Sequence, residues 1–191
     1  MAILFGRVSN VSRGSGNSAI KAAAYRSCSQ LTLNATDADT NITVGLIWDY
    51  SKKGGLAYSQ IHAPKDAPEW VYDRQTLWQR VEDVETKSNA RLAGEYTIAL
   101  PKKFTAEQNI EFLKEFVDNV FVSRGIVVDV NFHNDNTKNP HTHLMYVLRQ
   151  LEKFAEGVVD FATHRCRELQ TRAFLEGVIK EEHKQLLNKH L

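Results

Sequence analysis

Apolar and polar residues recur along this chain with two periods, one typical of strands and one typical of helices. Four short apolar stretches predict strands at 2–8, 95–100, 126–133 and 142–150. Apolar residues at helical spacing predict helices at 18–28, from Pro68 to about Ala90 and from 105 to about 122, and a charged helical stretch is expected after Asp160. Residues 34–66 predict loops and weak strands, one of them at 43–50.

Two of the predicted helices carry start signals of their own. Ser18 or Asn17 is a suitable N-cap for the first helix, because a short polar side chain can accept a hydrogen bond from a free backbone N–H. The sequence TAEQ at 105–108 is a capping-box pattern, so we expect the later helix to begin there.

The order of the elements predicts the fold class. The strands 126–133 and 142–150 are joined by the short segment 134–140, which suits a hairpin-like return between antiparallel strands. Strands and helices are mixed along the chain and no internal repeat is present. The sequence therefore predicts an α+β fold, an antiparallel β-sheet with helices packed on it, formed by a single domain over residues 1–191.

Three of the seven histidines, His133, His141 and His143, lie on the two strands just described or directly before them. Alternate residues of a strand share a face, so His141 and His143 lie about 6.6 Å apart on one face. Pairing of the two strands would bring His133, which shares its face with Asp129 and Asn131, beside them. Three neutral imidazoles in this arrangement would form a metal platform with open coordination positions.

The three histidines could also have no shared function. A single histidine is more often a surface or hydrogen-bonded residue, and H-x-H pairs arise by chance. The third histidine in phase favours a metal site over both of these interpretations. A structural zinc site is usually closed by four ligands, and no cysteine lies near this cluster, which argues against one.

Composition narrows the class of protein. The chain is 42% hydrophobic and 25% charged, and no run approaches the roughly 18 apolar residues of a membrane span. The first residues lack the features of a secretory signal. Cys28 and Cys166 are isolated and show no metal or redox spacing. We therefore expect a cytoplasmic, reduced protein with no membrane partner.

Charge is unevenly distributed along the chain. The net charge of +1 does not indicate a nucleic-acid-binding protein. Residues 1–36 nevertheless contain no acidic residue and four cations, namely Arg7, Arg13, Lys21 and Arg26. This segment could meet a phosphate backbone, although chance in a Ser/Asn/Ala-rich stretch accounts for the charge equally well.

Tyr25 is a candidate nucleophile within the sequence AAAYRS. The small alanines around it would leave its ring accessible, and Arg26 could stabilise a phosphate or a phenolate. On the residues alone, an ordinary tyrosine at the edge of the core is the better interpretation.

Two blocks of the sequence together resemble a known family. The start MAILFGRVSNVSRGSGNSAIKAAAYRS and the block NPHTHLM at 139–145 resemble the MobA/MobL relaxases, particularly the TraA-like conjugative branch of the HUH endonucleases. The segment RLAGEYTIALP at 91–101 resembles the part of these proteins that supplies an acidic residue. The similar segments span residue 1 to about 148, and the two blocks together are highly specific.

The resemblance implies a fold, an activity and a set of site residues. The fold would place the H-x-H motif on a central strand of the sheet. The activity would be site- and strand-specific nicking of single-stranded DNA at a plasmid transfer origin, through a 5′-phosphotyrosyl intermediate, in conjugative transfer or mobilisation. Tyr25 would be the nucleophile, and Glu95 would orient a ligand histidine or accept the tyrosine proton. His133, His141 and His143 would bind one divalent ion, Mn²⁺ or Mg²⁺ before Zn²⁺.

Partners follow from the same resemblance. We expect origin DNA, other relaxosome proteins and a helicase located elsewhere, since the chain contains no G-x-x-x-x-G-K-[ST] motif. Candidate DNA contacts are the cations Arg7, Arg13, Lys21, Arg26, Lys52 and Lys53 and the aromatic residues Trp48, Tyr50 and Tyr58.

The chain also departs from the family pattern. Cys28 stands where relatives often have glycine or a polar residue, residues 34–66 have no clear match, and few residues follow the H-x-H strand. The chain is therefore either a single relaxase domain or the N-terminal part of a longer protein. Two alternatives remain: another HUH-type nickase, such as a replication initiator or a transposase, and a non-catalytic metal-containing DNA-binding module. A tyrosine upstream of the H-x-H motif favours the relaxase.

Overall fold

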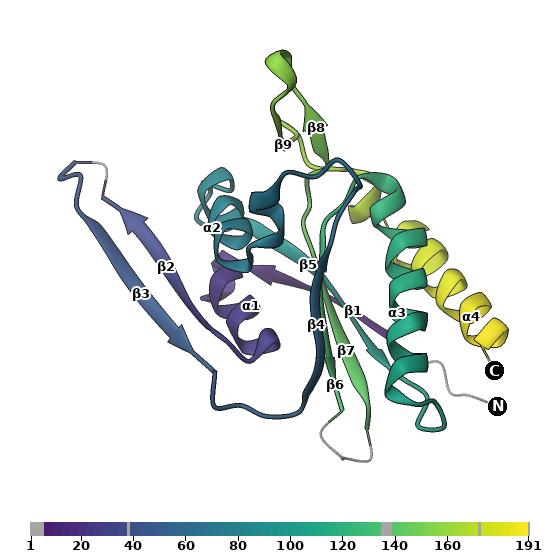
Figure 1. The fold of residues 1–191 in the computed structure, drawn as a ribbon. Coiled ribbons are helices and arrows are strands. Elements are labelled where there is room, and N and C mark those ends of the chain that lie inside the picture. Colours follow the sequence, from purple (N-terminus) through teal and green to yellow (C-terminus); the bar gives the residue numbers. More distant parts are fainter. Residues whose placement is uncertain (1–5, 38, 135–138, 172, 191) are drawn as a thin grey trace.

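Five strands form the central antiparallel sheet of the protein (Figure 1). The computed structural model describes residues 6–37, 39–134, 139–171 and 173–190. The sheet strands are β1 (Gly6–Ser12), β4 (Leu56–His62), β5 (Arg91–Ala99), β6 (Val128–His133) and β7 (His141–Tyr146). Their order is β1-β5-β7-β6-β4, and each neighbouring pair is antiparallel. The predicted α+β class is confirmed, and β7, which carries His141 and His143, is the central strand.

Helices cover both faces of this sheet (Figure 1). They are α1 (Ala19–Ser27), α2 (Arg74–Val84), α3 (Ala106–Val120) and α4 (Ile179–His190). On one face, Asp129 of β6 pairs with Arg74 of α2. On the other, Tyr96 of β5 packs against Phe116 of α3 and His183 of α4. The sheet is thus enclosed between α1 and α2 on one side and α3 and α4 on the other.

The two faces of the sheet differ in chemistry because neighbouring residues of a strand point to opposite sides. The face toward α3 and α4 carries mostly buried apolar side chains, such as Ile98, Phe132 and Leu144. The face toward α1 and α2 carries Asp129, which is fully buried yet satisfied. It accepts two hydrogen bonds from Arg74, one from Trp78 Nε1 at 3.0 Å and one from Asn131 at 2.9 Å. A buried carboxylate with this many donors fixes α2 on the sheet.

Both predicted helix starts are present. The Ser18 side chain accepts a hydrogen bond from the backbone N–H of Lys21 at 2.9 Å and caps α1. Thr105 and Gln108 form the reciprocal capping box of α3. The starts of both helices could be predicted from the sequence, because each cap involves residues only three positions apart.

The predicted helix from Pro68 to Ala90 is wrong in its bounds. Pro68 precedes a short 3₁₀ turn, η2 (Glu69–Tyr72), and α2 begins only after Asp73. The Asp73 side chain accepts from Thr76 N at 2.7 Å, so a new N-cap interrupts the helical pattern. α2 then ends at Val84, six residues earlier than predicted.

The strand predicted at 142–150 and the helix predicted after Asp160 also differ from the structure. β7 begins at His141 and ends at Tyr146, after which the chain forms a small hairpin of β8 (Leu151–Lys153) and β9 (Val159–Phe161). The helical part begins later, with η5 (Glu168–Gln170), a π-helical turn at Ala173–Val178 and then α4. Backbone hydrogen bonds from Ala162 to Gln150 and from Cys166 to Leu148 hold this segment extended.

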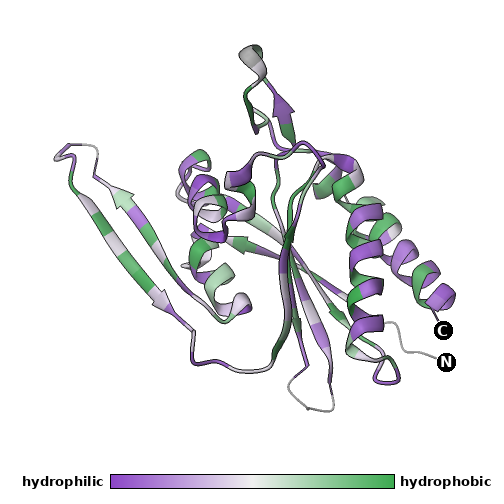
Figure 2. Cartoon of the chain, in the orientation of Figure 1, coloured by the Kyte–Doolittle hydropathy of each residue, from purple (hydrophilic) through white to green (hydrophobic). Residues whose placement is uncertain are grey.

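Residues 30–36 and 43–49 form a two-stranded arm outside the sheet (Figure 1). Its strands are β2 (Gln30–Thr36) and β3 (Thr43–Asp49), so the strand predicted at 43–50 is confirmed. Gln75 and Gln79 of α2 bond the backbone of Thr32 and Asn34 and cover the outer edge of β2. Figure 2 shows hydrophobic stretches on this arm.

Two expectations lie partly outside the described residues. The first predicted strand, 2–8, corresponds to β1, which begins at Gly6, and its first four residues, 2–5, lie outside. The predicted connection 134–140 includes residues 135–138, which also lie outside.

Candidate active site

Pairing of β6 with β7 brings the three histidines together. His133 lies directly opposite His141, and Asn131 lies opposite His143. The ring centroids are 5.4 Å apart for His133 and His141, 5.8 Å for His133 and His143, and 5.3 Å for His141 and His143. The strand phasing in the sequence therefore places all three imidazoles on one face, the face beneath α1.

Hydrogen bonds orient two of these rings in the way that metal-binding histidines require. Nδ1 of His143 donates to Glu95 Oε1 at 2.7 Å, and Nδ1 of His141 donates to the Asn139 carbonyl at 3.0 Å. Each bond leaves Nε2 as the nitrogen able to ligate an ion. A carboxylate or carbonyl on the far nitrogen is the usual partner of a metal-binding imidazole.

His133 is oriented differently from the other two histidines. Its Nε2 lies 2.9 Å from the carbonyl oxygen of Arg26, at the end of α1. Burial, together with the nearby positive charge of Lys53, lowers the pKa of His133 to about 4, so the ring is neutral near pH 7. Because the Arg26 carbonyl accepts a hydrogen bond from Nε2, the neutral ring keeps its lone pair on Nδ1, which is the nitrogen able to ligate a metal. The described residues contain no set of three or more His, Cys, Asp or Glu side chains already arranged around an ion.

Glu95 lies at the centre of a hydrogen-bond network beside His143. It is 6% exposed and pairs with Arg26, whose Nε and Nη2 donate to Oε1 and Oε2, each at 2.6 Å. Ser9 Oγ, from the neighbouring strand β1, donates to Oε2 at 3.0 Å. Burial raises the pKa of the Glu95 carboxyl, but the hydrogen bonds from His143 and Arg26 outweigh it and hold the pKa well below its usual range. The carboxylate thus stays charged and is a poor proton acceptor at neutral pH.

Tyr25 lies near the end of α1, with its ring on the outside of the helix. The ring is 46% exposed, whereas the neighbouring Ala22, Ala23 and Ala24 are buried. Tyr50 contacts it edge-on at a centroid distance of 5.2 Å. Because the next residue, Arg26, contacts His133 through its carbonyl, the helix end that carries Tyr25 abuts the histidine cluster.

An open groove runs along α1 on the side where Tyr25 is exposed. Its volume is about 310 Å³, and its lining comes from β1, α1 and Tyr50, namely Asn10, Val11, Asn17, Lys21, Ala22, Tyr25, Arg26 and Tyr50. Lys53 lies over the Tyr25 ring with Nζ 3.7 Å from the centroid, and Lys21 lies 4.5 Å over Trp48. Aromatic rings and ammonium groups thus lie together at this groove, a combination suited to unpaired nucleotides.

Two of the predicted DNA-binding cations have internal partners instead. Arg13 bonds Glu82 through Oε2 at 2.6 Å and also bonds the backbone carbonyls of Glu82, Glu85 and Lys87, so it closes the carboxyl end of α2. Arg26 pairs with Glu95. Neither guanidinium faces the groove freely, because each is committed to a carboxylate on another element.

The aromatic candidates also separate in the structure. Trp48 and Tyr50 lie on the groove side, next to Lys21 and Tyr25. Tyr58 pairs across the sheet with Phe132 and bonds His62, and Lys114 of α3 lies over its ring. Tyr58 is therefore on the face away from the histidines.

Sequence reasoning missed three residues that support the site. Ser9 bonds Glu95, the Asn139 carbonyl orients His141, and Thr97 Oγ1 lies 3.4 Å from Nδ1 of His143. Thr97 carried a weak signal, since it shares a strand face with Glu95. The role of Ser9 depends on the pairing of β1 with β5, which no local pattern reveals.

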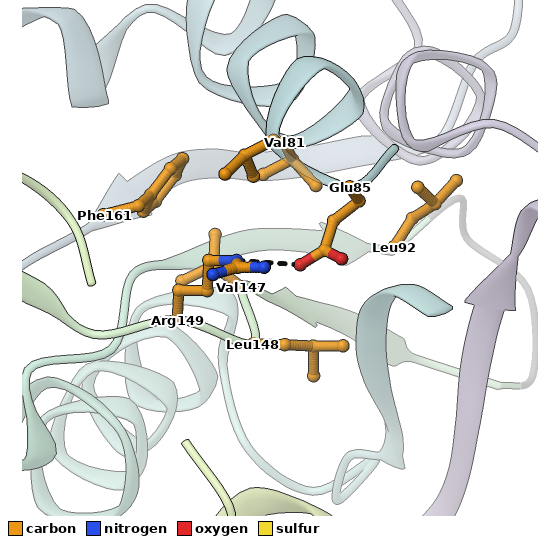
Figure 3. A pocket seen from close by; sticks show the side chains of 8 residues that line it. Val81, Glu85, Leu92, Val147, Leu148, Arg149 and Phe161 are labelled. Carbon is orange, nitrogen blue, oxygen red and sulfur yellow. Dashed lines mark hydrogen bonds and ion pairs between the residues drawn. The ribbon is translucent and has the colours of Figure 1, made fainter. Parts of the chain in front are cut away.

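A separate cavity between α2 and the end of β7 is not a ligand site. Figure 3 shows Glu85 paired with Arg149 at this cavity. Its volume is about 10 Å³, which is room for no more than one water molecule. The groove beside Tyr25 is larger than this cavity and is the better candidate for a ligand site.

Among the described residues, no helix combines the length and the apolar character that a membrane span requires.

The fold and the site together define an antiparallel-sheet protein in which a tyrosine-bearing helix lies against three histidines and a buried carboxylate. The chain belongs to the MobA/MobL family, whose sequence profile matches residues 17–189. The resemblance seen in the two sequence blocks is thereby confirmed.

Individual relatives agree with this assignment. The chain is 40% identical over 167 residues to "Conjugal transfer protein TraA" of Rhizobium radiobacter, which covers 82% of this chain and 14% of the relative. It is 32% identical over 137 residues to "Mobilization protein MobL" of Acidithiobacillus ferridurans, covering 72% of this chain and 33% of the relative. The chain thus spans only a small part of each relative.

Solved structures share the fold. One, described as "Molecular Basis of Vancomycin Resistance Transfer in Staphylococcus aureus", is 32% identical with a TM-score of 0.82, covering 100% of this chain and 93% of the other. A MobM relaxase domain, described as Mn-bound and bound to plasmid pMV158 oriT DNA, is 16% identical with a TM-score of 0.50, covering 99% and 87%. At that identity the likeness is one of fold.

Proposed function

We propose that this chain is the DNA-nicking domain of a relaxase, which cuts one strand of single-stranded DNA at a plasmid transfer origin in conjugative transfer or mobilisation. The observation that carries the proposal is the contact between the end of α1 and the histidine cluster. The Arg26 carbonyl contacts His133, and Arg26 directly follows the exposed Tyr25, which supports a nucleophile presented from this end of α1 toward the histidines.

Tyr25 acts as the nucleophile in this proposal. Its phenolic oxygen loses a proton to solvent and attacks the scissile phosphorus, so that a bond forms between that oxygen and phosphorus. The bond to the 3′ oxygen breaks, and this oxygen takes up a proton from solvent. The strand then ends in a free 3′-hydroxyl, and its 5′ phosphate stays on Tyr25, which conserves the bond for later rejoining. The exposure of the ring allows a phosphate to approach, and Lys53 above the ring would meet its negative charge.

The three histidines are suited to hold one divalent ion. His141 and His143 already present Nε2, and His133 is neutral and adjacent. Imidazole nitrogens favour a transition-metal ion, so the donor set fits Mn²⁺, with Zn²⁺ and Mg²⁺ as alternatives. A bound ion would polarise the phosphate oxygens and offset the charge that develops during transfer. We assign Glu95 to orienting His143 and not to accepting the tyrosine proton, because its pKa is held low.

Single-stranded DNA would lie in the groove along α1. Lys21 lines this groove, and Lys53 lies over the ring of Tyr25, which also lines it. Lys52, next to Lys53 in the chain, and Arg7 on β1 are exposed and could also meet the DNA backbone. Trp48 and Tyr50 would stack unpaired bases. A helicase and further relaxosome proteins would act with this chain, from other chains or from other parts of a longer protein, in the cytoplasm.

The proposal is tested by incubating the protein with an end-labelled single-stranded origin oligonucleotide and Mn²⁺, followed by a denaturing gel. We expect one cleaved product and a protein–DNA adduct that survives denaturation, both abolished by a chelator. If the wild type binds the oligonucleotide but forms neither product with Mn²⁺ nor with Mg²⁺, the chain is a binding module and not a nickase.

A further inference from the structure

Arg26 links the helix that carries Tyr25 to the sheet that carries the histidines. All three nitrogens of its guanidinium have partners in the structure. Nε and Nη2 bond the two oxygens of Glu95, and Nη1 bonds the Ala22 carbonyl of its own helix at 2.9 Å. The side chain is only 15% exposed, so this arrangement is shielded from solvent.

The backbone of the same residue makes a second link. The Arg26 carbonyl meets Nε2 of His133, while the side chain reaches His143 through Glu95. Two of the three histidines, on neighbouring strands β6 and β7, are therefore connected to a single residue of α1. That residue directly follows Tyr25 in the chain.

We infer that Arg26 is a positioning residue, which fixes the turn of α1 bearing Tyr25 against the histidine cluster and holds Glu95 in the orientation that His143 needs. This inference rests on the proposed function. Arginine suits the task because its planar fork matches both carboxylate oxygens at once, whereas a lysine ammonium reaches them only as a point charge. The charge of Arg26, which the sequence alone makes a candidate for DNA contact, is instead neutralised by Glu95.

The inference predicts that loss of the guanidinium weakens metal binding before any DNA is present. Without Arg26, Glu95 loses two of its four donated hydrogen bonds and the orientation of His143 is no longer fixed. Loss of an outer partner of a metal-binding histidine typically weakens the metal affinity by about 10–100-fold. DNA affinity and its dependence on salt should stay nearly unchanged, because the guanidinium of Arg26 is paired with Glu95 and is not assigned to a phosphate.

The test measures Mn²⁺ affinity by electron paramagnetic resonance in the DNA-free protein for wild type, Arg26→Gln and Arg26→Lys. We expect Arg26→Gln to bind Mn²⁺ about 10–100-fold more weakly, with Arg26→Lys in between. Arg167→Gln is the matched control, since Arg167 is an exposed arginine outside the site, and its Mn²⁺ affinity should equal that of wild type. Thermal unfolding shows which variants are folded, and Arg26→Lys, which keeps the charge, carries the test if Arg26→Gln does not fold.

DNA binding in the absence of metal separates the two roles of Arg26. Unchanged Mn²⁺ affinity, together with weaker DNA binding and a salt dependence reduced by about one counterion, would make Arg26 a phosphate contact and overturn the inference. Unchanged Mn²⁺ affinity with unchanged DNA binding would overturn it as well. A wild type that binds Mn²⁺ but nicks no origin strand would refute the proposed function alone, because the Arg26 measurement needs no cleavage.

Discussion

At the scale of single residues, partners decide what each charged group can do. Arg13 and Arg26 contribute to the positive charge of the first 36 residues, yet both are bound to glutamates 69 positions further along the chain. Charge is visible in the sequence, but the carboxylate that neutralises it is brought near only by folding. The histidines could be predicted, in contrast, because strand alternation alone determines which face they share.

The first prediction concerns Glu95. Glu95→Gln keeps the size of the side chain and removes its charge, so we expect an intact fold and nicking slowed by about 10–100-fold, because His143 loses its charged partner. Nicking rates between pH 6 and 9 measure the effect. Glu111→Gln, at an exposed glutamate of α3, is the control and should cleave like wild type. Equal rates for Glu95→Gln and wild type across this range would show that Glu95 plays no part.

The stability difference between wild type and Glu95→Gln should depend on pH. The folded-state pKa of Glu95 is depressed, so its ion pair contributes fully above the ordinary glutamate pKa of about 4.3 and is lost as the pH falls below that value. Wild type should exceed Glu95→Gln in free energy of unfolding by a constant amount above about pH 5, and the difference should shrink on acidification. Urea unfolding at several pH values measures it, and a difference that grows on acidification would contradict the assignment.

At the scale of elements, contacts between distant segments determine where helices begin and end, and local sequence patterns did not predict these bounds. Apolar spacing continues from Trp70 to Val84, but Asp73 caps a new helix within it, and Arg13, from the turn after β1, closes the end of that helix. The face of Tyr58 depends on a register shift between Leu56 and Tyr58 in β4, which strand alternation does not reveal. The helix caps were predictable because their residues are sequence neighbours.

Gly94 lies where β5 meets the ring of Tyr146 on β7. A Cβ at Gly94 would lie 2.1 Å from Cζ of Tyr146, and this ring packs against Phe121 at a centroid distance of 4.8 Å. We expect Gly94→Ala to lower the free energy of unfolding by about 1–3 kcal/mol, because neither ring has room to move. Denaturant unfolding measures the change. Gly54→Ala, where a Cβ would meet no atom within 4 Å, is the control, and equal effects of the two variants would refute the packing argument.

The docking of α4 depends on a buried histidine. His183 is 1% exposed among Phe112 and Phe116, its Nδ1 lies 3.1 Å from the Tyr96 hydroxyl, and burial lowers its pKa to about 4. Protonation therefore favours the unfolded state, and stability should fall from about pH 6.5 down to about pH 4, by roughly 3 kcal/mol in total. Unfolding of wild type against His183→Gln measures this.

The exposed His164 provides the control for α4. His164→Gln should keep the acid sensitivity of wild type, whereas His183→Gln should lose the part that belongs to the buried ring. The protection of the α4 amides against hydrogen exchange, measured relative to the intrinsic exchange rate at each pH, should fall on acidification in wild type. An acid response that is identical in His183→Gln and wild type would show that other groups cause it.

At the scale of the whole molecule, the sequence predicted a sheet with helices packed on it and three histidines on one sheet face. It did not predict which contacts fix the helices and the arm on the sheet. The antiparallel sheet, its helices and the shared face of His133, His141 and His143 follow from periodicity. The arm formed by β2 and β3 was only partly predicted, because its packing depends on side-chain amides of α2 that pair with its edge. The contact between the end of α1 and His133 depends on how α1 lies on the sheet, and no local pattern determines that.

The central claim is that Tyr25 forms the covalent bond to DNA, and mass spectrometry of the adduct tests it most directly. The protein is reacted with a single-stranded origin oligonucleotide and Mn²⁺, digested with nuclease and protease, and the peptide that carries a 5′-phosphonucleotide is sequenced. We expect the modification on Tyr25, and we expect Tyr25→Phe to bind DNA like wild type but to form no adduct. An adduct on Tyr50 or on any other residue, or one that persists in Tyr25→Phe, would contradict the account.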